Sequence, residues 1–327
     1  MIAFEGVLGQ PSVRILERAL ADGRLASSYL FEGPAGVGKE LAARALGREL
    51  VCRRDGEIDS EAERRAAAGA HPDLRVFPPR DEGNRNIQVD FLRNEILPVA
   101  QFAPFEAENA VLIFPEADVS FPENHPESAN ALLKTLEEPR PGVHFVLLSE
   151  RPDRLLPTIR SRCQRLRFQR LPAAVLKEIL RSQGVSGDAL EASVGLADGR
   201  ADRARWLAES GAGPELVAQA QKIDESIAAR DGLAGLGERL AKSAELSQVL
   251  DSLATYYRDV AAAGLGVDGD RLVFRAQAAA LRQRAGSLPP ARAAARVERI
   301  RRAVDTFERN ANVQSALDAL FFDLASI

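Results

Sequence analysis

Four short apolar runs in the first half of the chain have the length and the polar flanks of buried strands. A fifth segment alternates apolar and polar residues, as an edge or exit strand does. Helical spacing of apolar residues separates these segments, which predicts a doubly wound parallel sheet of five strands. The predicted strands are 28–31, 74–77, 111–114, 145–148 and 163–169, and the predicted helices are 12–22, 39–50, 88–97 and 127–138.

The pattern changes at Pro172, after which only helical spacing occurs. Long helices follow the turn at 211–214, with apolar stripes over 246–260 and in the last helix that are typical of core packing. We therefore expect an α/β half followed by an all-α half, divided into domains at 1–170, 171–210 and 211–327. The predicted short helices are 172–184, 187–197 and 199–209, and the charged, alanine-rich segment 53–70 is predicted to be a frayed helix or a loop.

Composition narrows the class of protein only modestly. The 327 residues are 46% hydrophobic and 28% charged, and the net charge of −4 excludes a global basic field. Two cysteines, Cys52 and Cys163, exclude a disulfide framework and a four-cysteine metal site. The N-terminal residues lack a basic signal-peptide region, and no apolar run reaches the ~20 residues of a membrane helix. These features predict a cytoplasmic protein without a membrane partner.

The segment 33–40, Gly-Pro-Ala-Gly-Val-Gly-Lys-Glu, carries the first candidate chemistry. It matches the phosphate-binding pattern G-x-x-x-x-G-K-[ST] except at its last position, where Glu40 replaces the hydroxyl that holds Mg²⁺. The pattern lies between a predicted strand and a predicted helix, as a phosphate-binding loop requires. The candidate nucleotide-binding residues of this loop are Gly33, Gly36, Gly38, Lys39 and Glu40.

Two further segments follow in the order that a nucleotide-binding motor domain needs. The apolar run 111–114 leads into Pro115 and Glu116, where such proteins place an Asp for the metal and a Glu for the attacking water. Pro115 offers no side-chain oxygen, whereas Glu116 is kept. Later in the chain, Ser161 and Arg162 precede the exit strand. An arginine at this position can act as an arginine finger on the phosphates bound by a neighbouring subunit. The alternative for Arg162 is a surface arginine in a weak ion pair.

The stretch from NALLKTLEEP at Asn130 through LLPTIRSRCQ resembles the clamp-loader branch of the AAA+ ATPases, which place ring-shaped sliding clamps on primed DNA. Several shorter pieces match in the same order along nearly the whole chain. They are FEGVLGQ near the start, Tyr29-Leu-Phe, His71-Pro-Asp-Leu74, Tyr257-Arg-Asp259 and Asn310-Ala-Asn312. The resemblance implies an AAA+ P-loop domain, a small helical lid and a C-terminal helical collar.

The resemblance also implies roles for individual residues. Arg162, with Ser161, matches the SRC motif whose arginine reaches into the adjacent subunit's ATP site. Ser149 falls at the sensor-1 position, and Arg203 matches the sensor-2 arginine of the lid, although a solvated helix charge is an equal alternative for Arg203. Arg93 is expected to touch DNA phosphate. The implied partners are the loader's ATPase (gamma/tau) and delta subunits, the sliding clamp and primed DNA.

The chain also departs from the family pattern. The family carries a four-cysteine zinc site before the HPDL motif, but here only Cys52 is present, so we expect no zinc or other metal. The stretch between Asp118 and Asn130 is longer than the pattern, and we expect residues 119–129 to enlarge a surface loop.

Glu40 and Pro115 together decide the expected activity. Glu40 would add about 4 kcal/mol of repulsion against a phosphate charge at roughly 4 Å and an effective dielectric near 20, unless a metal intervened. We therefore expect a non-hydrolysing loader subunit that requires no cofactor, with weak metal-independent binding of ATP or ADP left open. The alternatives are an active ATPase subunit of the same loader, a stand-alone P-loop kinase or NTPase, and a scaffold whose loop binds nothing.

Overall fold

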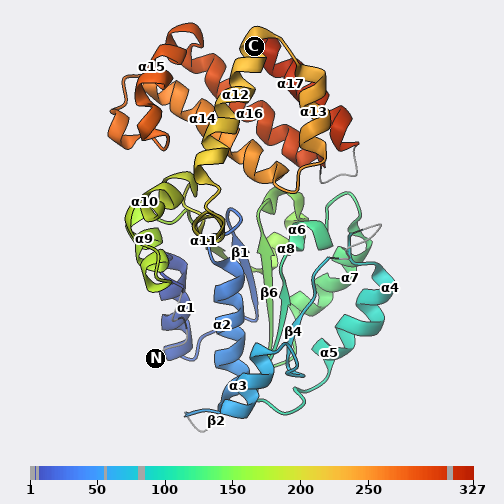
Figure 1. Ribbon diagram of the computed structural model, residues 1–327. Helices are drawn as coiled ribbons and strands as arrows, with labels where there is room; N and C mark the ends of the chain where they lie inside the picture. The colour runs from blue at the N-terminus through green and yellow to red at the C-terminus, as the bar shows by residue number, and fades with distance from the viewer. Residues whose placement is uncertain (1–3, 5–6, 55–56, 80–84, 308–311) are drawn as a thin grey trace. The chain divides into compact units, whose positions relative to one another are not determined.

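The computed structural model describes residue 4 and residues 7–54, 57–79, 85–307 and 312–327 (Figure 1). The chain divides into two compact units. The first contains Met1–Ile179 and Gly199–Asp202, and the second contains Leu180–Asp198 and Arg203–Ile327. Each unit is described by itself below, and the predicted division into three domains stays a prediction.

The first unit is built on a five-stranded parallel sheet whose strand order is β4-β5-β6-β1-β7. This order requires crossover helices, and it confirms the doubly wound parallel sheet predicted from the alternation of strands and helices. The strands are β1 (Ser28–Glu32), β4 (Leu74–Val76), β5 (Ala110–Phe114), β6 (Val143–Ser149) and β7 (Gln164–Arg167).

Helices cover both faces of this sheet, because alternate strand residues enter two separate cores. On β5, Val111 and Ile113 join the core under α1, α2 and α3, whereas Leu112 and Phe114 join the core under α5, α7 and α8. These helices are α1 (Pro11–Ala21), α2 (Lys39–Cys52), α3 (Ser60–Ala67), α4 (Val89–Phe91), α5 (Leu97–Gln101), α6 (Ala117–Ser120), α7 (Pro126–Glu137) and α8 (Pro157–Arg162).

The predicted helix 88–97 is interrupted by one π-helical turn, Leu92–Ile96, and then continues through α5 to Gln101. Pro98 has no N–H to donate to a preceding carbonyl, so a regular α-helical ladder cannot pass through this position. The sequence pattern predicted a helix here. It did not predict the π-helical turn, nor that the helix continues to Gln101.

Segment 53–70 folds as a small ribbon and a helix. The two-residue strands β2 (Arg53–Arg54) and β3 (Glu57–Ile58) pair antiparallel, and α3 follows with Asp59 as its N-cap. Asp59 accepts hydrogen bonds from the N–H groups of Glu61 and Ala62, as a capping aspartate does. The helical interpretation of this segment is therefore confirmed for residues 60–67, and the ribbon was not predicted.

The expected insertion at 119–129 is anchored rather than loose. Phe121 is fully buried and packs edge-on against Phe114, with ring centroids 5.3 Å apart. Pro122 forms a β-bridge to Leu155, and the Glu123 N–H donates to the Arg154 carbonyl at 2.8 Å. Within the insertion, residues 123–125 and Glu127 are exposed.

All described secondary structure after β7 is helical, which confirms the predicted all-α half. In the second unit, α14 packs against α12, α15 and α16, and α13 packs against α17. The predicted stripes of α14 and α17 are mostly buried, as core packing requires. The helices after β7, of which α9 and α11 begin in the first unit, are α9 (Ala173–Ser182), α10 (Gly187–Leu196), α11 (Ala201–Ser210), α12 (Gly213–Ala229), α13 (Leu233–Ala241), α14 (Leu246–Gly264), α15 (Ala278–Ser287), α16 (Pro290–Phe307) and α17 (Val313–Ser326).

Within the described part of the chain, no helix has both the length and the apolar content to cross a bilayer. Two of the short family-like pieces fall partly outside that part: Glu5 and Gly6 of the first, and Asn310 and Ala311 of the last. Asn312 is described and caps α17 by accepting a hydrogen bond from the Ser315 N–H at 3.1 Å.

Candidate functional site

The candidate phosphate loop, residues 33–38, connects the end of β1 to the start of α2, as its sequence pattern requires. Gly36 and Gly38 have φ values of 66° and 98°, which residues other than glycine rarely adopt. At Gly36 there is a second reason for glycine, because a Cβ there would overlap the carboxylate of Asp202. The loop therefore has the positive-φ backbone that a phosphate nest uses.

Lys39, the cation of the loop, is folded back onto the loop itself. Its Nζ donates to the carbonyl oxygens of Gly33 and Pro34, each at 2.6 Å. Burial lowers the pKa of Lys39, and the nearby carboxylates of Glu150, Asp118 and Asp202 oppose that shift. Lys39 is thus surrounded by carbonyl and carboxylate oxygens of its own chain.

Glu40, which replaces the hydroxyl of the pattern, and Glu116, which is kept, each pair with an arginine. Glu40 Oε1 lies 2.7 Å from Arg44 Nη2, one turn along α2, and Glu116 Oε2 lies 3.1 Å from Arg85 Nη2. Glu40 is therefore directed along the exposed face of its helix. Pro115 follows β5 directly, where it supplies no side-chain oxygen for a metal.

Ser149 lies beside the start of the phosphate loop. It ends β6 in register with Glu32 of β1, and its carbonyl accepts a hydrogen bond from the Gly33 N–H at 3.1 Å. The side chain is buried, and its Oγ accepts from the Arg151 N–H at 3.1 Å. The parallel pairing of β1 and β6 thus brings two sequence-predicted positions together.

Arg203 is directed into the helical unit. Its Nη1 lies 2.7 Å from Asp251 Oδ2 and its Nη2 donates to Ser252 Oγ at 2.8 Å, both on α14. The side chain is 4% exposed, so the solvated-charge interpretation of Arg203 is wrong. The sensor-2 role stays a prediction, and a phosphate would have to compete with Asp251 for this guanidinium.

Arg162 and Ser161 lie at the end of α8, directly before β7. Arg162 donates through Nε to Glu137 Oε1 at 2.7 Å, and its Nη2 pairs with the same oxygen. Its Nη1 donates to the Thr158 carbonyl at 2.9 Å, and Ser161 Oγ donates to that carbonyl at 3.0 Å. The ion pair of the alternative interpretation is therefore present, and it fixes the orientation of the guanidinium.

Sequence reasoning missed three residues around these sites: Gln10, Glu137 and Asp202. Gln10 is buried, and its side-chain amide donates to the carbonyls of Val37 and Gln169 at 2.9 and 2.7 Å, which ties the loop to the segment after β7. Each of the three acts through partners distant in sequence, so only their positions inside family-like motifs gave any signal. Arg93, the expected DNA contact, is exposed on the π-helical turn.

Segment 53–70, where the family resemblance implied a zinc site, shows no suitable ligand set in the described residues. No group of three or more His, Cys, Asp or Glu side chains could hold a metal ion there or elsewhere in that part of the chain. Cys52 is fully buried, and burial raises the pKa of its thiol to about 11, so the thiolate needed for zinc is disfavoured. The residues present do not fit a zinc site.

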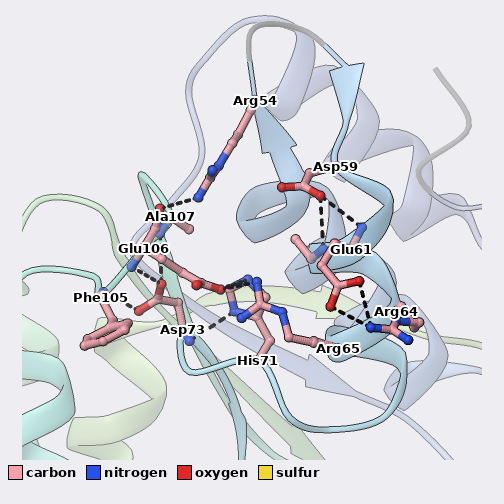
Figure 2. Close-up of polar contacts among 11 residues, drawn as sticks. Arg54, Asp59, Glu61, Arg64, Arg65, His71, Asp73, Phe105, Glu106 and Ala107 are labelled. Atoms are coloured by element: carbon pink, nitrogen blue, oxygen red, sulfur yellow. Dashed lines mark hydrogen bonds and ion pairs between the residues drawn. The ribbon is translucent and has the colours of Figure 1, made fainter.

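Figure 2 shows a polar cluster that connects segment 53–70 to the loop before β5. The buried ring of His71 accepts a hydrogen bond at Nδ1 from the Asp73 N–H at 3.1 Å, and its Nε2 lies 3.1 Å from Glu106 Oε1. The same Glu106 oxygen lies 2.7 Å from Arg65 Nη2 of α3. An ion pair and a histidine thus connect the two segments.

Asp73 fixes the loop on the other side of this cluster. Its two carboxylate oxygens accept hydrogen bonds from three successive backbone N–H groups, those of Phe105, Glu106 and Ala107, at 2.6, 2.9 and 2.9 Å. Three such bonds to a charged acceptor are among the stronger hydrogen bonds in proteins. The backbone of residues 105–107 is therefore held in one conformation.

We predict that His71 makes stability depend on pH. Burial lowers the pKa of His71 from its usual value of 6.5, and Glu106 opposes the shift, so the folded chain favours neutral imidazole. Because the folded pKa is below the unfolded one, this stability is present above about pH 6.5 and is lost as the pH falls through the folded value. His71→Asn should therefore reduce the loss of unfolding free energy between about pH 7 and about pH 5.

Urea denaturation at several pH values measures the slope of the unfolding free energy against pH. His125→Asn is the matched control, because His125 is exposed, and it should leave the slope of the wild-type chain unchanged. An equal slope in the His71→Asn and His125→Asn chains would contradict the role of His71. The half-buried His144, whose pKa burial also lowers, is present in all three chains and contributes equally to the slope of each.

Comparison with known proteins agrees with this geometry. The family model described as "DNA polymerase III, delta subunit" matches residues 9–172, half of the chain. The DNA polymerase III subunit delta' of Bacillus subtilis is 29% identical over 321 residues, which cover 95% of this chain and 94% of that one.

Two further relatives match shorter stretches. Subunit delta' of Pseudomonas aeruginosa is 39% identical over 142 residues, or 42% of each chain. Subunit gamma/tau of Mycobacterium tuberculosis is 34% identical over 197 residues, or 57% of this chain and 32% of that one. The match thus spans less than half the length of these two relatives. With its first half matched by the family model and nearly its whole length by a delta' relative, the chain belongs to the delta' family of DNA polymerase III clamp-loader subunits.

Proposed function

We propose that this chain is a non-hydrolysing subunit of the DNA polymerase III clamp loader that donates Arg162 to the ATP site of a neighbouring subunit. It would help to load the sliding clamp on primed DNA in the cytoplasm. The observation that carries the proposal is the orientation of Arg162, combined with the loss of both magnesium-ligand side chains from the chain's own loop.

Arg162 is arranged to bind a second anion. A guanidinium has five N–H groups, and the bonds to Glu137 and Thr158 use one each on Nε, Nη2 and Nη1. These bonds leave one N–H on each terminal nitrogen that can donate to a phosphoryl oxygen. Its exposed fraction is 28%, so an incoming phosphate can reach it.

The chain's own loop is poorly suited to hydrolysis. Pro115 and Glu40 replace the two side chains that would hold Mg²⁺, so the metal would be bound by nucleotide and water alone. The Lys39 ammonium already has two carbonyl partners, and binding a phosphate would require it to leave them. Ser149 and Glu116 are kept in the sequence, but neither supplies the missing ligands.

The proposed partners are the gamma/tau and delta subunits, the sliding clamp and primed DNA. The helical second unit is proposed to pack beside the corresponding helices of other subunits as a collar. Arg93, exposed on its π-helical turn, is proposed to contact DNA phosphate.

Two measurements on the purified chain test this function. Incubated alone with ATP and Mg²⁺, it should show no turnover above a protein-free control. Mixed with gamma/tau and delta of the same organism, it should co-elute with them in size-exclusion chromatography. Robust magnesium-dependent turnover by the chain alone would instead support an active ATPase subunit or a stand-alone NTPase, and failure to co-elute would contradict a loader role.

A further inference from the structure

A four-residue segment far along the chain, Gly199–Asp202, lies directly on the phosphate loop. The Ala201 N–H donates to the Gly36 carbonyl at 2.7 Å, and the Gly199 carbonyl accepts from the Leu171 N–H at 2.8 Å. The first bond holds the segment against the loop, and the second ties it to Leu171, in the same compact unit. The side chain that follows, Asp202, is therefore held in a defined place.

The carboxylate of Asp202 is seated on Gly36. All three atoms of that carboxylate group come so close to the Gly36 backbone that any Cβ there would overlap them. Arg200, two residues earlier, holds the group from the other side, with Nη2 at 3.3 Å from Asp202 Oδ2. Position 36 thus accommodates a carboxylate only because it is glycine.

The Asp202 carboxylate is negatively charged, like the phosphate that a loop of this kind binds. The loop presents backbone dipoles and the Lys39 ammonium, an arrangement that favours an anion. Asp202 is among the carboxylates whose charge acts on Lys39, together with Glu150 and Asp118. The Lys39 ammonium of this chain thus already has carboxylates of its own chain nearby, with Arg200 acting against them.

We propose that Asp202 acts as an internal anion that excludes nucleoside di- and triphosphates from the phosphate loop. An entering phosphate would meet like charge on Asp202 and would have to displace the segment bonded to Gly36. Asp202 is in this sense a residue that determines ligand exclusion, in addition to the loss of the metal-ligand side chains at Glu40 and Pro115. The inference goes beyond the proposed function, because it concerns nucleotide binding by this chain's own loop. The proposed function concerns the action of Arg162 at the ATP site of a neighbouring subunit.

Titration of the full chain with a fluorescent ADP analogue, in EDTA so that metal plays no part, tests the inference. Asp202→Asn keeps the shape of the side chain but removes its charge, and should tighten binding at least about tenfold relative to the wild-type chain. Asp202→Ala should do the same, and it covers the case in which the asparagine variant folds poorly. Thermal melts of each variant establish that it is folded.

Two controls locate the effect. Glu209→Gln removes an exposed acid from the same helix, α11, and should leave binding as in the wild-type chain. Lys39→Ala combined with Asp202→Asn should abolish the gain, which places the bound analogue at the loop. Equal binding by the wild-type chain and both folded Asp202 variants, including no binding by any, would overturn the inference and leave the proposed role of Arg162 untouched.

Discussion

Replacing Arg162 with alanine should lower ATP hydrolysis at the adjoining site of the assembled clamp loader by roughly 10³-fold or more, the range known for arginine fingers acting in trans. The transition state of phosphoryl transfer spreads charge over the equatorial oxygens, and a guanidinium neutralises that charge through two parallel N–H donors. Arg162 has one N–H left on each terminal nitrogen while Glu137 and Thr158 hold its other donors. Alanine removes the charge and both donors.

The assembly itself should survive this substitution. Arg162 bonds only to α7 and α8 of its own chain in the contacts described above, and an ion pair exposed to this degree contributes little to stability. Arg162→Lys keeps a charge but loses the planar fork, so it should recover only a small part of the rate. Arg160→Ala, two residues away on the same helix, is the matched control and should retain the wild-type rate.

The second large effect is expected from Asp224 in the helical unit. This carboxylate is 3% exposed and lies between two arginines, with Arg284 Nε at 2.5 Å and Arg296 Nη1 at 3.1 Å. It also accepts hydrogen bonds from Tyr257 at 3.0 Å and Tyr256 at 3.3 Å. Asp224 thus connects four side chains from α14, α15 and α16 to α12.

Asp224→Ala should destabilise the helical unit by about 3–5 kcal/mol, because it leaves two largely buried guanidinium groups without their counter-charge. The chain has a single tryptophan, Trp206, which lies in the second unit. Its fluorescence during urea denaturation therefore reports on that unit alone.

Asp231→Ala removes a carboxylate from an exposed position and is the matched control, with an expected change within about 0.5 kcal/mol. A similar midpoint for the Asp224→Ala and Asp231→Ala chains would show that the buried network carries little of the stability. The Tyr257-Arg-Asp259 segment, noticed first as a family-like motif, has a structural role through Tyr257 in this network.

Hydrophobic pattern predicted the centre of the sheet well because β1, β5 and β6 are buried on both faces. The run 111–114, for example, contains only apolar residues that divide between two cores, and it could hardly form anything but a central strand. The β2–β3 ribbon was not predictable in this way, because Arg53, Arg54 and Glu57 carry no apolar alternation. Its formation depends on pairing and on contacts such as that of Arg54 with the Glu106 carbonyl at 2.9 Å.

The candidate site was predictable where it is local and not where it is assembled from distant segments. The phosphate loop is one continuous motif, so its glycines and Lys39 could be identified directly. Asp202 and Glu137 act on Gly36 and Arg162 through the fold, and no spacing rule links them. For Arg203, the helical pattern could not reveal Asp251, whose charge holds the guanidinium inside the helical unit.

Hydrolysis of ATP by loaders assembled with one altered copy of this chain tests the central claim most directly. One loader would carry Lys39→Ala, which disables the chain's own phosphate loop, and the other Arg162→Ala, which removes the donated arginine. Clamp- and DNA-stimulated turnover is compared at equal extents of assembly. The proposed function predicts a rate near that of the wild type for Lys39→Ala and a severe loss for Arg162→Ala; a loss for Lys39→Ala with none for Arg162→Ala would contradict it.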